Sequence, residues 1–153
     1  MKLADFVLQP RGPYLFDHYI HPETIPTPLG AFSLELMVDD AAEAPADEAM
    51  LAALVELRRA FEADLETIVQ LVYEQYVMAT SNDFWSDACN LKKGLQAHEL
   101  APLLENQTLS VSRDPGWGDR PEISARVYMS PSWDEEHGLY FSHQDGEWVQ
   151  EDC

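Results

Sequence analysis

Apolar and polar residues alternate in several stretches near both ends of the chain. The longest alternations cover residues 32–38 and 122–129, where every second side chain is apolar. A period of two is typical of a strand that buries one of its faces. Shorter alternations at 108–112 and 139–142 repeat this pattern. We therefore predict strands in the first and last thirds of the chain.

The middle of the chain has a helical period instead. Apolar residues recur at steps of three and four between residues 46 and 79, which predicts one amphipathic helix. Its apolar stripe consists of Met50, Leu54, Leu57, Phe61, Leu65, Ile68, Val72 and Tyr76. Asp47 and Glu48 lie near its start, where acidic groups favour the positive end of the helix dipole. A continuous helix would be roughly 50 Å long, which exceeds the need of a small domain, so we expect a bend or break near its middle. Shorter helical segments are expected after the capping residues 81–83 and at 99–104.

The order of these elements predicts the fold class. Asp145-Gly146 is a strong hairpin signal, because both residues accept a positive φ, and it pairs residues 138–143 with 147–150. Strands, helices and strands in succession predict an α+β fold. We expect a largely antiparallel sheet with a long amphipathic helix and one or two short helices packed on one face. The length of 153 residues suits a single domain. That domain comprises N-terminal strands at 1–40, a helical part at 46–105 and C-terminal strands at 107–150.

Charge is the unusual feature of the composition. Asp and Glu number 28 and Lys and Arg number 9, so the formal net charge is -19. A phosphate backbone is bound by clustered Lys and Arg, so we expect no direct binding to nucleic acid or to an anionic membrane. One interpretation is an ordinary acidic surface. The other is an acidic face that meets a basic protein, since opposite potentials speed encounter.

Cysteine usage and hydropathy indicate a cytoplasmic protein. Cys89 and Cys153 form no framework of spaced cysteines, which favours a reducing compartment. The first residues lack the apolar core of a signal peptide, and no run of 18 apolar residues is present. We therefore expect a cytoplasmic location and no membrane span.

Residues 130–148, "SPSWDEEHGLYFSHQDGEW", concentrate acidic, histidine and tryptophan residues in one short stretch. Local chemistry predicts two successive hairpins: Pro131 ends a strand, Asp134–Glu136 form an exposed turn, and Trp133 covers the end of the sheet. Gly138 is expected to supply a backbone conformation that other residues resist. Leu139 then returns to the core.

The alternative interpretation is a carboxylate–histidine site at residues 134–137. Adjacent residues of a strand point to opposite faces, so at most two of these four side chains converge on an ion without an irregular turn. A transition metal usually takes three or four ligands. His18 and His21 are interpreted as surface histidines, and the sequence does not place them or His143 nearby. We predict no catalytic residue, no metal ligand and no cofactor.

Trp133-Asp134-Glu135-Glu136-His137-Gly138-Leu139 resembles a group of small uncharacterised bacterial domains. These carry a Trp-Asp-x-Glu-His-Gly-Leu motif near the C-terminus, followed by a strand and a short hairpin. Tyr140-Phe141 and residues 144–149 continue the pattern here. Members of the group often accompany toxins in defence and competition loci as presumed immunity proteins. The resemblance implies no catalytic role, and Trp133, His137, Gly138 and Leu139 are expected to be structural.

These observations favour an acidic cytoplasmic binding protein that neutralises a cognate bacterial toxin by occluding its active or substrate-binding site. The expected partner is a basic toxin domain, and the oligomeric state stays open. The acidic residues expected to bind it are Asp39, Asp40, Glu43, Asp47, Asp134, Glu135 and Glu136. The alternatives are a small metal- or carboxylate-dependent enzyme that uses residues 134–137, and an adaptor that self-associates.

Overall fold

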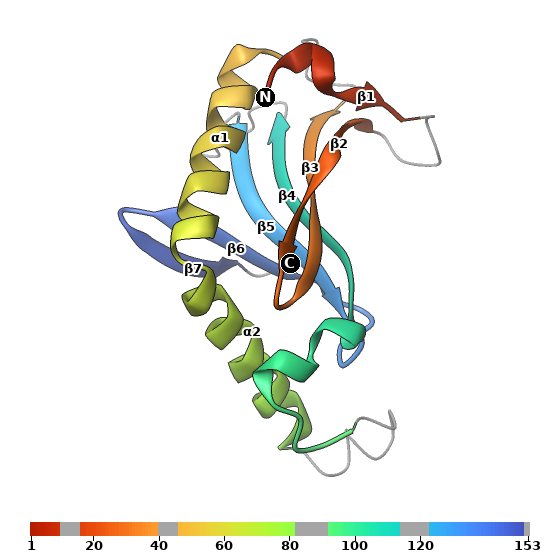
Figure 1. Ribbon diagram of the computed structural model, residues 1–153, viewed down its shortest axis with the longest axis vertical. Helices are drawn as coiled ribbons and strands as arrows, with labels where there is room; N and C mark the ends of the chain where they lie inside the picture. The colour runs from red at the N-terminus through yellow and green to blue at the C-terminus, as the bar shows by residue number, and fades with distance from the viewer. Residues whose placement is uncertain (10–15, 40–45, 82–91, 114–122, 152–153) are drawn as a thin grey trace.

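One sheet and two α-helices make up the described part of the chain (Figure 1). The computed structural model describes residues 1–9, 16–39, 46–81, 92–113 and 123–151, without the side chains of Phe16 and Asp39. Seven strands of these residues form the sheet, and every neighbouring pair is antiparallel except β3 and β4. The predicted α+β class and largely antiparallel sheet are therefore confirmed.

The strands lie in the sheet in the order of the sequence. They are β1 (Val7–Leu8), β2 (Phe16–Thr27), β3 (Gly30–Asp39), β4 (Leu104–Arg113), β5 (Ile123–Pro131), β6 (Leu139–Gln144) and β7 (Glu147–Glu151). The helices are α1 (Glu48–Ala63) and α2 (Leu65–Thr80), with short 3₁₀ helices η1 (Leu3–Asp5), η3 (Ala97–Glu99) and η4 (Ala101–Leu103). Parallel strands cannot be joined by a tight turn. Both α-helices accordingly lie in the connection between β3 and β4.

The long helix predicted over residues 46–79 is instead two helices of 16 residues each. They meet at Asp64, whose φ of -111° and ψ of 26° depart from helical values. Its carboxylate accepts a hydrogen bond from Trp148 Nε1 at 3.0 Å. The interruption therefore presents Asp64 to β7.

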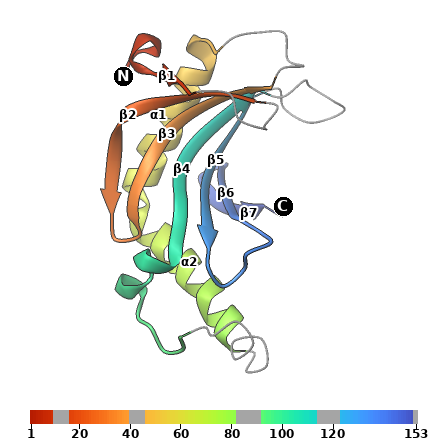
Figure 2. The same cartoon turned by 90° about the vertical axis from the view of Figure 1, so that its right-hand side faces the viewer.

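The core lies between α1, α2 and one face of the sheet. In β3 the alternating residues Phe32, Leu34, Leu36 and Val38 are buried, whereas Ser33, Glu35 and Met37 face the other side and are half-buried. The apolar helix stripe is buried as well, except for the half-buried Leu65. Figure 2 shows β2 to β5 in front of α1, so the helices cover only one face. No described helix covers the opposite face.

The C-terminal hairpin forms as predicted. Gln144 pairs with Glu147, and the turn residues Asp145 and Gly146 have φ values of 52° and 82°. By contrast, the short helix expected around Phe84 and Trp85 lies outside the described residues. Among the described helices, none is both long and apolar enough to cross a membrane.

Candidate functional site

The acidic turn between β5 and β6 is held by the side chain of Asp134. Its Oδ1 accepts hydrogen bonds from the backbone N–H groups of Glu136 and His137, at 3.2 and 3.1 Å. Its own N–H donates to the carbonyl oxygen of Pro131 at 3.3 Å. Aspartate often caps a turn in this way because its short carboxylate reaches the backbone two or three residues ahead. The turn therefore has a defined backbone path, and Glu135 and Glu136 project from it into solvent.

Trp133 attaches this turn to the helical layer. The residue is only 4% exposed, and its ring meets the ring of Tyr76 edge-on with centroids 5.6 Å apart. Tyr76 in turn donates its hydroxyl to the carbonyl of Lys92 and accepts the N–H of Leu95 at 3.2 Å. One buried contact thus links the turn, α2 and the segment before η3.

Gly138 is needed for space rather than for an unusual backbone angle. The glycines with positive φ in the described residues are Gly30, Gly94 and Gly146, so the expectation of a special conformation at Gly138 was wrong. A Cβ atom at Gly138 would instead lie 2.2 Å from Cε2 of Tyr128. The ring of Tyr128 on β5 therefore occupies the position that a side chain would take.

His137 contacts Asp134 but gathers no larger cluster. Its Nδ1 lies 3.2 and 3.3 Å from the two carboxylate oxygens of Asp134, and its side chain is 59% exposed. Across the described ranges, no group of three or more His, Cys, Asp or Glu side chains lies close enough to hold a metal ion.

The interpretation of both N-terminal histidines as surface residues was wrong for His21. That residue is 8% exposed and packs edge-on against Phe6, with ring centroids 5.1 Å apart.

Four carboxylates line a single hollow of about 390 Å³ beside this turn. Three of them, Asp134, Glu135 and Glu136, belong to the turn, and the fourth is Glu105 at the start of β4. We call this the acidic hollow. Its described lining contains no Lys or Arg, while Pro102, Leu103 and Pro131 supply apolar walls.

A second hollow of about 530 Å³ lies on the other side of the same turn. Asp134, His137 and Gly138 line both hollows, so the turn forms the ridge between them. Met78, Ala79, Trp133 and Leu139 supply apolar walls to the second hollow, and Met78 is 66% exposed. Gln75, Gln150 and Glu151 supply polar walls. We call this the apolar hollow, after its four apolar walls.

Glu105 was not among the acids expected from the sequence. It lies opposite Ser130 in the pairing of β4 with β5, and the register of that pair slips between Glu105 and Thr108. The alternation at 108–112 indicates a strand, but it does not show that the strand begins at Leu104 or which strand is its neighbour. Glu105 therefore becomes a candidate only when the pairing is known.

Asp47, another acid expected to bind a partner, caps the N-terminus of α1. Its Oδ1 accepts the N–H of Met50 at 3.1 Å, and its Oδ2 pairs with the guanidinium of Arg113, whose side chain is 8% exposed. The backbone N–H of Met50 lowers the pKa of Asp47 below its ordinary value of 3.8, and the charge of Arg113 acts in the same direction.

The other acids expected near the start of α1 cannot be placed in the same way. Asp40 and Glu43 lie outside the described residues, and Asp39 has no described side chain. Among the described acids expected to bind a partner, those of the turn line the two hollows beside it, and Asp47 lines neither.

Replacing Asp47 with alanine should lower the free energy of unfolding by about 1.5 kcal/mol, since an N-cap contributes about 1 kcal/mol and the half-exposed ion pair adds about 0.5 kcal/mol. Asn also caps helices, so Asp47→Asn should lose only the part of this free energy that depends on the charge of the carboxylate. A carboxylate whose folded-state pKa is lowered contributes stability above its unfolded pKa and loses it as pH falls through the folded value. The difference between wild type and Asp47→Asn should therefore shrink as pH falls below about 3.8.

Urea unfolding of the three proteins at pH 7 and pH 3 measures this effect. Glu147→Gln, on an exposed acid of β7, is the control for a general charge effect. An unchanged difference between wild type and Asp47→Asn at the two pH values would show that the charge of Asp47 does not stabilise the fold.

One comparison with known proteins gives a match. A family model described as a domain of unknown function, DUF6985, matches residues 12–151. The chain belongs to this family. The part matched to DUF6985 includes Glu105 and the whole turn from Pro131 to Leu139. No curated protein and no solved structure matches the chain.

Proposed function

We propose that this DUF6985 chain is an acidic binding protein that neutralises a bacterial toxin in the cytoplasm by covering its basic active or substrate-binding surface. The acidic hollow is the observation that carries the proposal. It gathers Glu105 and the three turn acids around one concavity whose described lining has no basic side chain. Lys and Arg side chains of a partner fit such a surface in both charge and shape.

The arginines of the described residues do not oppose this charge. Arg58 and Arg59 pair with Glu62 and Glu56 on α1, Arg113 pairs with Asp47, and Arg126 pairs with Glu151. The carboxylate in each of these pairs is not one of the four acids of the acidic hollow. The carboxylates of the acidic hollow have no such partner among the described ion pairs apart from the contact between Asp134 and His137.

The apolar hollow supplies the second element that a protein interface needs. Interfaces depend on a few apolar anchors surrounded by polar groups that contribute specificity. Met78 and Trp133 line the hollow on one side of the turn ridge, and Glu105, Glu135 and Glu136 line the hollow on the other. The partner segment that fits best is therefore an apolar side chain flanked by Lys or Arg. The resemblance of residues 133–139 to presumed immunity proteins supports a toxin as that partner.

Neutralising the hollow should weaken binding to the partner by about 3- to 100-fold, since three exposed charge contacts contribute about 0.2–1 kcal/mol each. The variant is Glu105→Gln/Glu135→Gln/Glu136→Gln, and Asp134 is retained because it holds the turn. The matched control is Glu66→Gln/Glu74→Gln/Glu147→Gln, which removes the same charge from exposed positions elsewhere. The partner is the toxin domain that co-purifies with the wild-type protein from its native host.

Binding is measured by calorimetry at about 0.05 M and 0.5 M salt, because screening shortens the reach of exposed charges. Wild type and control should bind equally and lose affinity with salt, whereas the hollow variant should bind weakly at both concentrations. Growth rescue of cells that express the toxin domain gives the functional readout. Equal affinity of the hollow variant and the control, or rescue by both, would contradict the proposal.

A further inference from the structure

The face of the sheet opposite α1 contains a groove of about 640 Å³. Side chains from β2 to β6 line it, and those that matter here are His18, Glu35, Ser110, Arg126, Tyr128 and Tyr140. We call it the sheet-face groove. Its volume lies within the range of about 300–1,000 Å³ that is typical of small-molecule pockets. Tyr128 lines both this groove and the acidic hollow, but none of the four acids of the hollow lines the groove, so the groove is a second candidate site.

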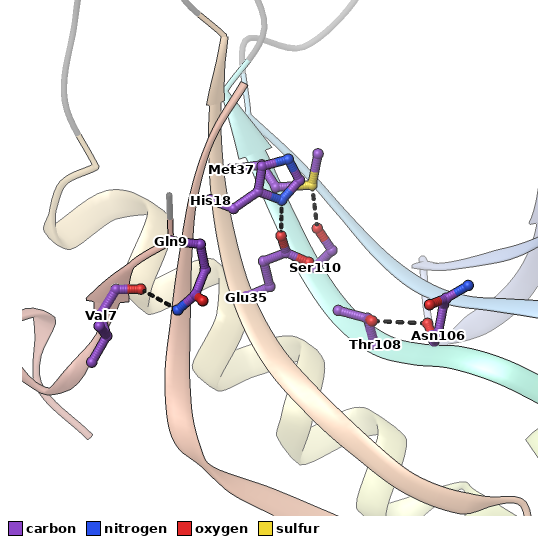
Figure 3. Close-up of polar contacts among 8 residues, drawn as sticks. All are labelled: Val7, Gln9, His18, Glu35, Met37, Asn106, Thr108 and Ser110. Atoms are coloured by element: carbon purple, nitrogen blue, oxygen red, sulfur yellow. Dashed lines mark hydrogen bonds and ion pairs between the residues drawn. The ribbon is translucent and has the colours of Figure 1, made fainter. Parts of the chain in front are cut away.

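The charged groups of the groove already have partners. His18 Nδ1 hydrogen-bonds Glu35 Oε1, as Figure 3 shows. Arg126 Nε lies 2.8 Å from Glu151 Oε2. A charged ligand would have to compete with these contacts, because Glu35 is hydrogen-bonded to His18 and Arg126 lies beside Glu151. The groove therefore favours a neutral ligand.

Two tyrosines provide flat apolar surface in the groove. The rings of Tyr128 and Tyr140 lie with centroids 4.8 Å apart, and the guanidinium of Arg126 lies 5.7 Å from the centroid of Tyr140. Both residues are only half-buried. Such rings pack against the C–H face of a ligand ring and fix its plane.

The polar groups between them include both donors and acceptors. Glu35, Ser110 and Arg126 are direct neighbours across β3, β4 and β5, so their side chains share one row of this face. Ser110 donates its hydroxyl to the thioether sulfur of Met37 at 3.2 Å (Figure 3). A thioether is a weak acceptor, so exchange of this bond for one to a ligand oxygen costs little. The carboxylate of Glu35, the hydroxyl of Ser110 and the guanidinium of Arg126 thus lie in one row. They match a ligand whose adjacent groups both donate and accept hydrogen bonds.

From these features we infer that the sheet-face groove binds a neutral polyhydroxylated ring, that is, a pyranose sugar. The ring packs on Tyr140, its hydroxyls bridge Glu35 and Arg126, and the hydroxyl of Ser110 turns from Met37 towards it. A pyranose combines electrical neutrality, an apolar ring face and adjacent hydroxyl groups.

Titration of the ¹⁵N-labelled protein with neutral sugars tests the inference. Methyl glucoside, methyl galactoside, methyl mannoside and N-acetylglucosamine are compared with glucuronate and glucosamine as the anionic and cationic controls. At least one neutral sugar should shift the amides of Met37, Ser110 and Arg126, with a dissociation constant of about 1 mM or weaker, as expected for a ligand of this size. The two charged sugars should bind at least about fivefold more weakly than the neutral sugar that binds best.

Two substitutions test the contacts. Ser110→Val should weaken binding about fivefold and Tyr140→Leu at least about tenfold, because they remove a hydrogen bond and a ring contact. The matched controls are Thr67→Val, an exposed hydroxyl on α2, and Tyr73→Leu, a half-buried tyrosine on α2. Spectra of each unliganded variant show that it is folded. The inference is overturned by no shift with any neutral sugar at about 20 mM, by equal binding of the charged sugars, or by shifts that survive both groove substitutions.

Discussion

Replacing Trp133 with alanine is expected to lower the free energy of unfolding by about 4 kcal/mol, the range found when a buried aromatic side chain is truncated. Trp133 is 4% exposed and meets the edge of Tyr76, which is 1% exposed. The residue is the point at which the β5–β6 turn contacts α2. Removing the indole leaves a cavity that the neighbouring rings cannot fill without moving.

Urea unfolding monitored by circular dichroism measures this change. Trp133→Phe keeps a ring against Tyr76 and should recover about half of the loss, since less apolar volume is removed. The control is Trp148→Phe, a half-buried tryptophan on β7 whose N–H donates to Asp64. A loss of less than about 1 kcal/mol in Trp133→Ala would contradict a structural role for Trp133.

Much of the sheet could be predicted because its signals are local. The alternation in β3 and β5 and the Asp145-Gly146 turn depend on residues next to each other in the sequence. The parallel pairing of β3 with β4 depends on contacts such as Ser33 with Thr108, which are far apart in the chain. The sequence pattern cannot show this pairing, because a strand presents the same alternation whichever neighbour it has.

The division of the helical stripe at Asp64 was expected only in its approximate place. The apolar spacing continues across the break, with Phe61 before it and Ile68 after it both fully buried. What distinguishes Asp64 is its hydrogen bond to Trp148, a residue of the last strand. We infer that tertiary contacts decide where the helix is interrupted. The local periodicity of apolar residues does not reveal these contacts.

Only part of the candidate site could be predicted, because some of its residues come together through tertiary contacts. The turn at 134–136 follows from its residue types, because Pro131 and the acids disfavour continuation of the strand. Glu105 joins these acids only through the pairing of β4 with β5. The pair of Asp47 with Arg113 was not predictable either, because the two residues are far apart in the sequence and only the fold brings this buried arginine to the cap of α1.

The second large effect is expected at Gly138, where alanine should cost about 3 kcal/mol by overpacking. The added Cβ would lie 2.2 Å from Cε2 and 3.0 Å from Cζ of Tyr128. That ring cannot easily move aside, because its hydroxyl hydrogen-bonds Ser130 Oγ at 2.7 Å and its face packs on Tyr140. The strain should therefore also weaken the turn that presents Glu135 and Glu136.

A double-mutant cycle with Tyr128→Leu separates this clash from other effects of the substitution. With the ring removed, Gly138→Ala should cost less than about 1 kcal/mol, so the two changes should be strongly non-additive. Gly146→Ala is the control: its φ is 82° and no heavy atom lies within 4 Å of the added Cβ, so its cost of about 1 kcal/mol comes from the backbone alone. That cost should be the same with or without Tyr128. If Gly138→Ala were equally costly in both backgrounds, the close approach of Tyr128 would not be the reason for a glycine at this position, and the turn would have to be held by contacts of the backbone itself.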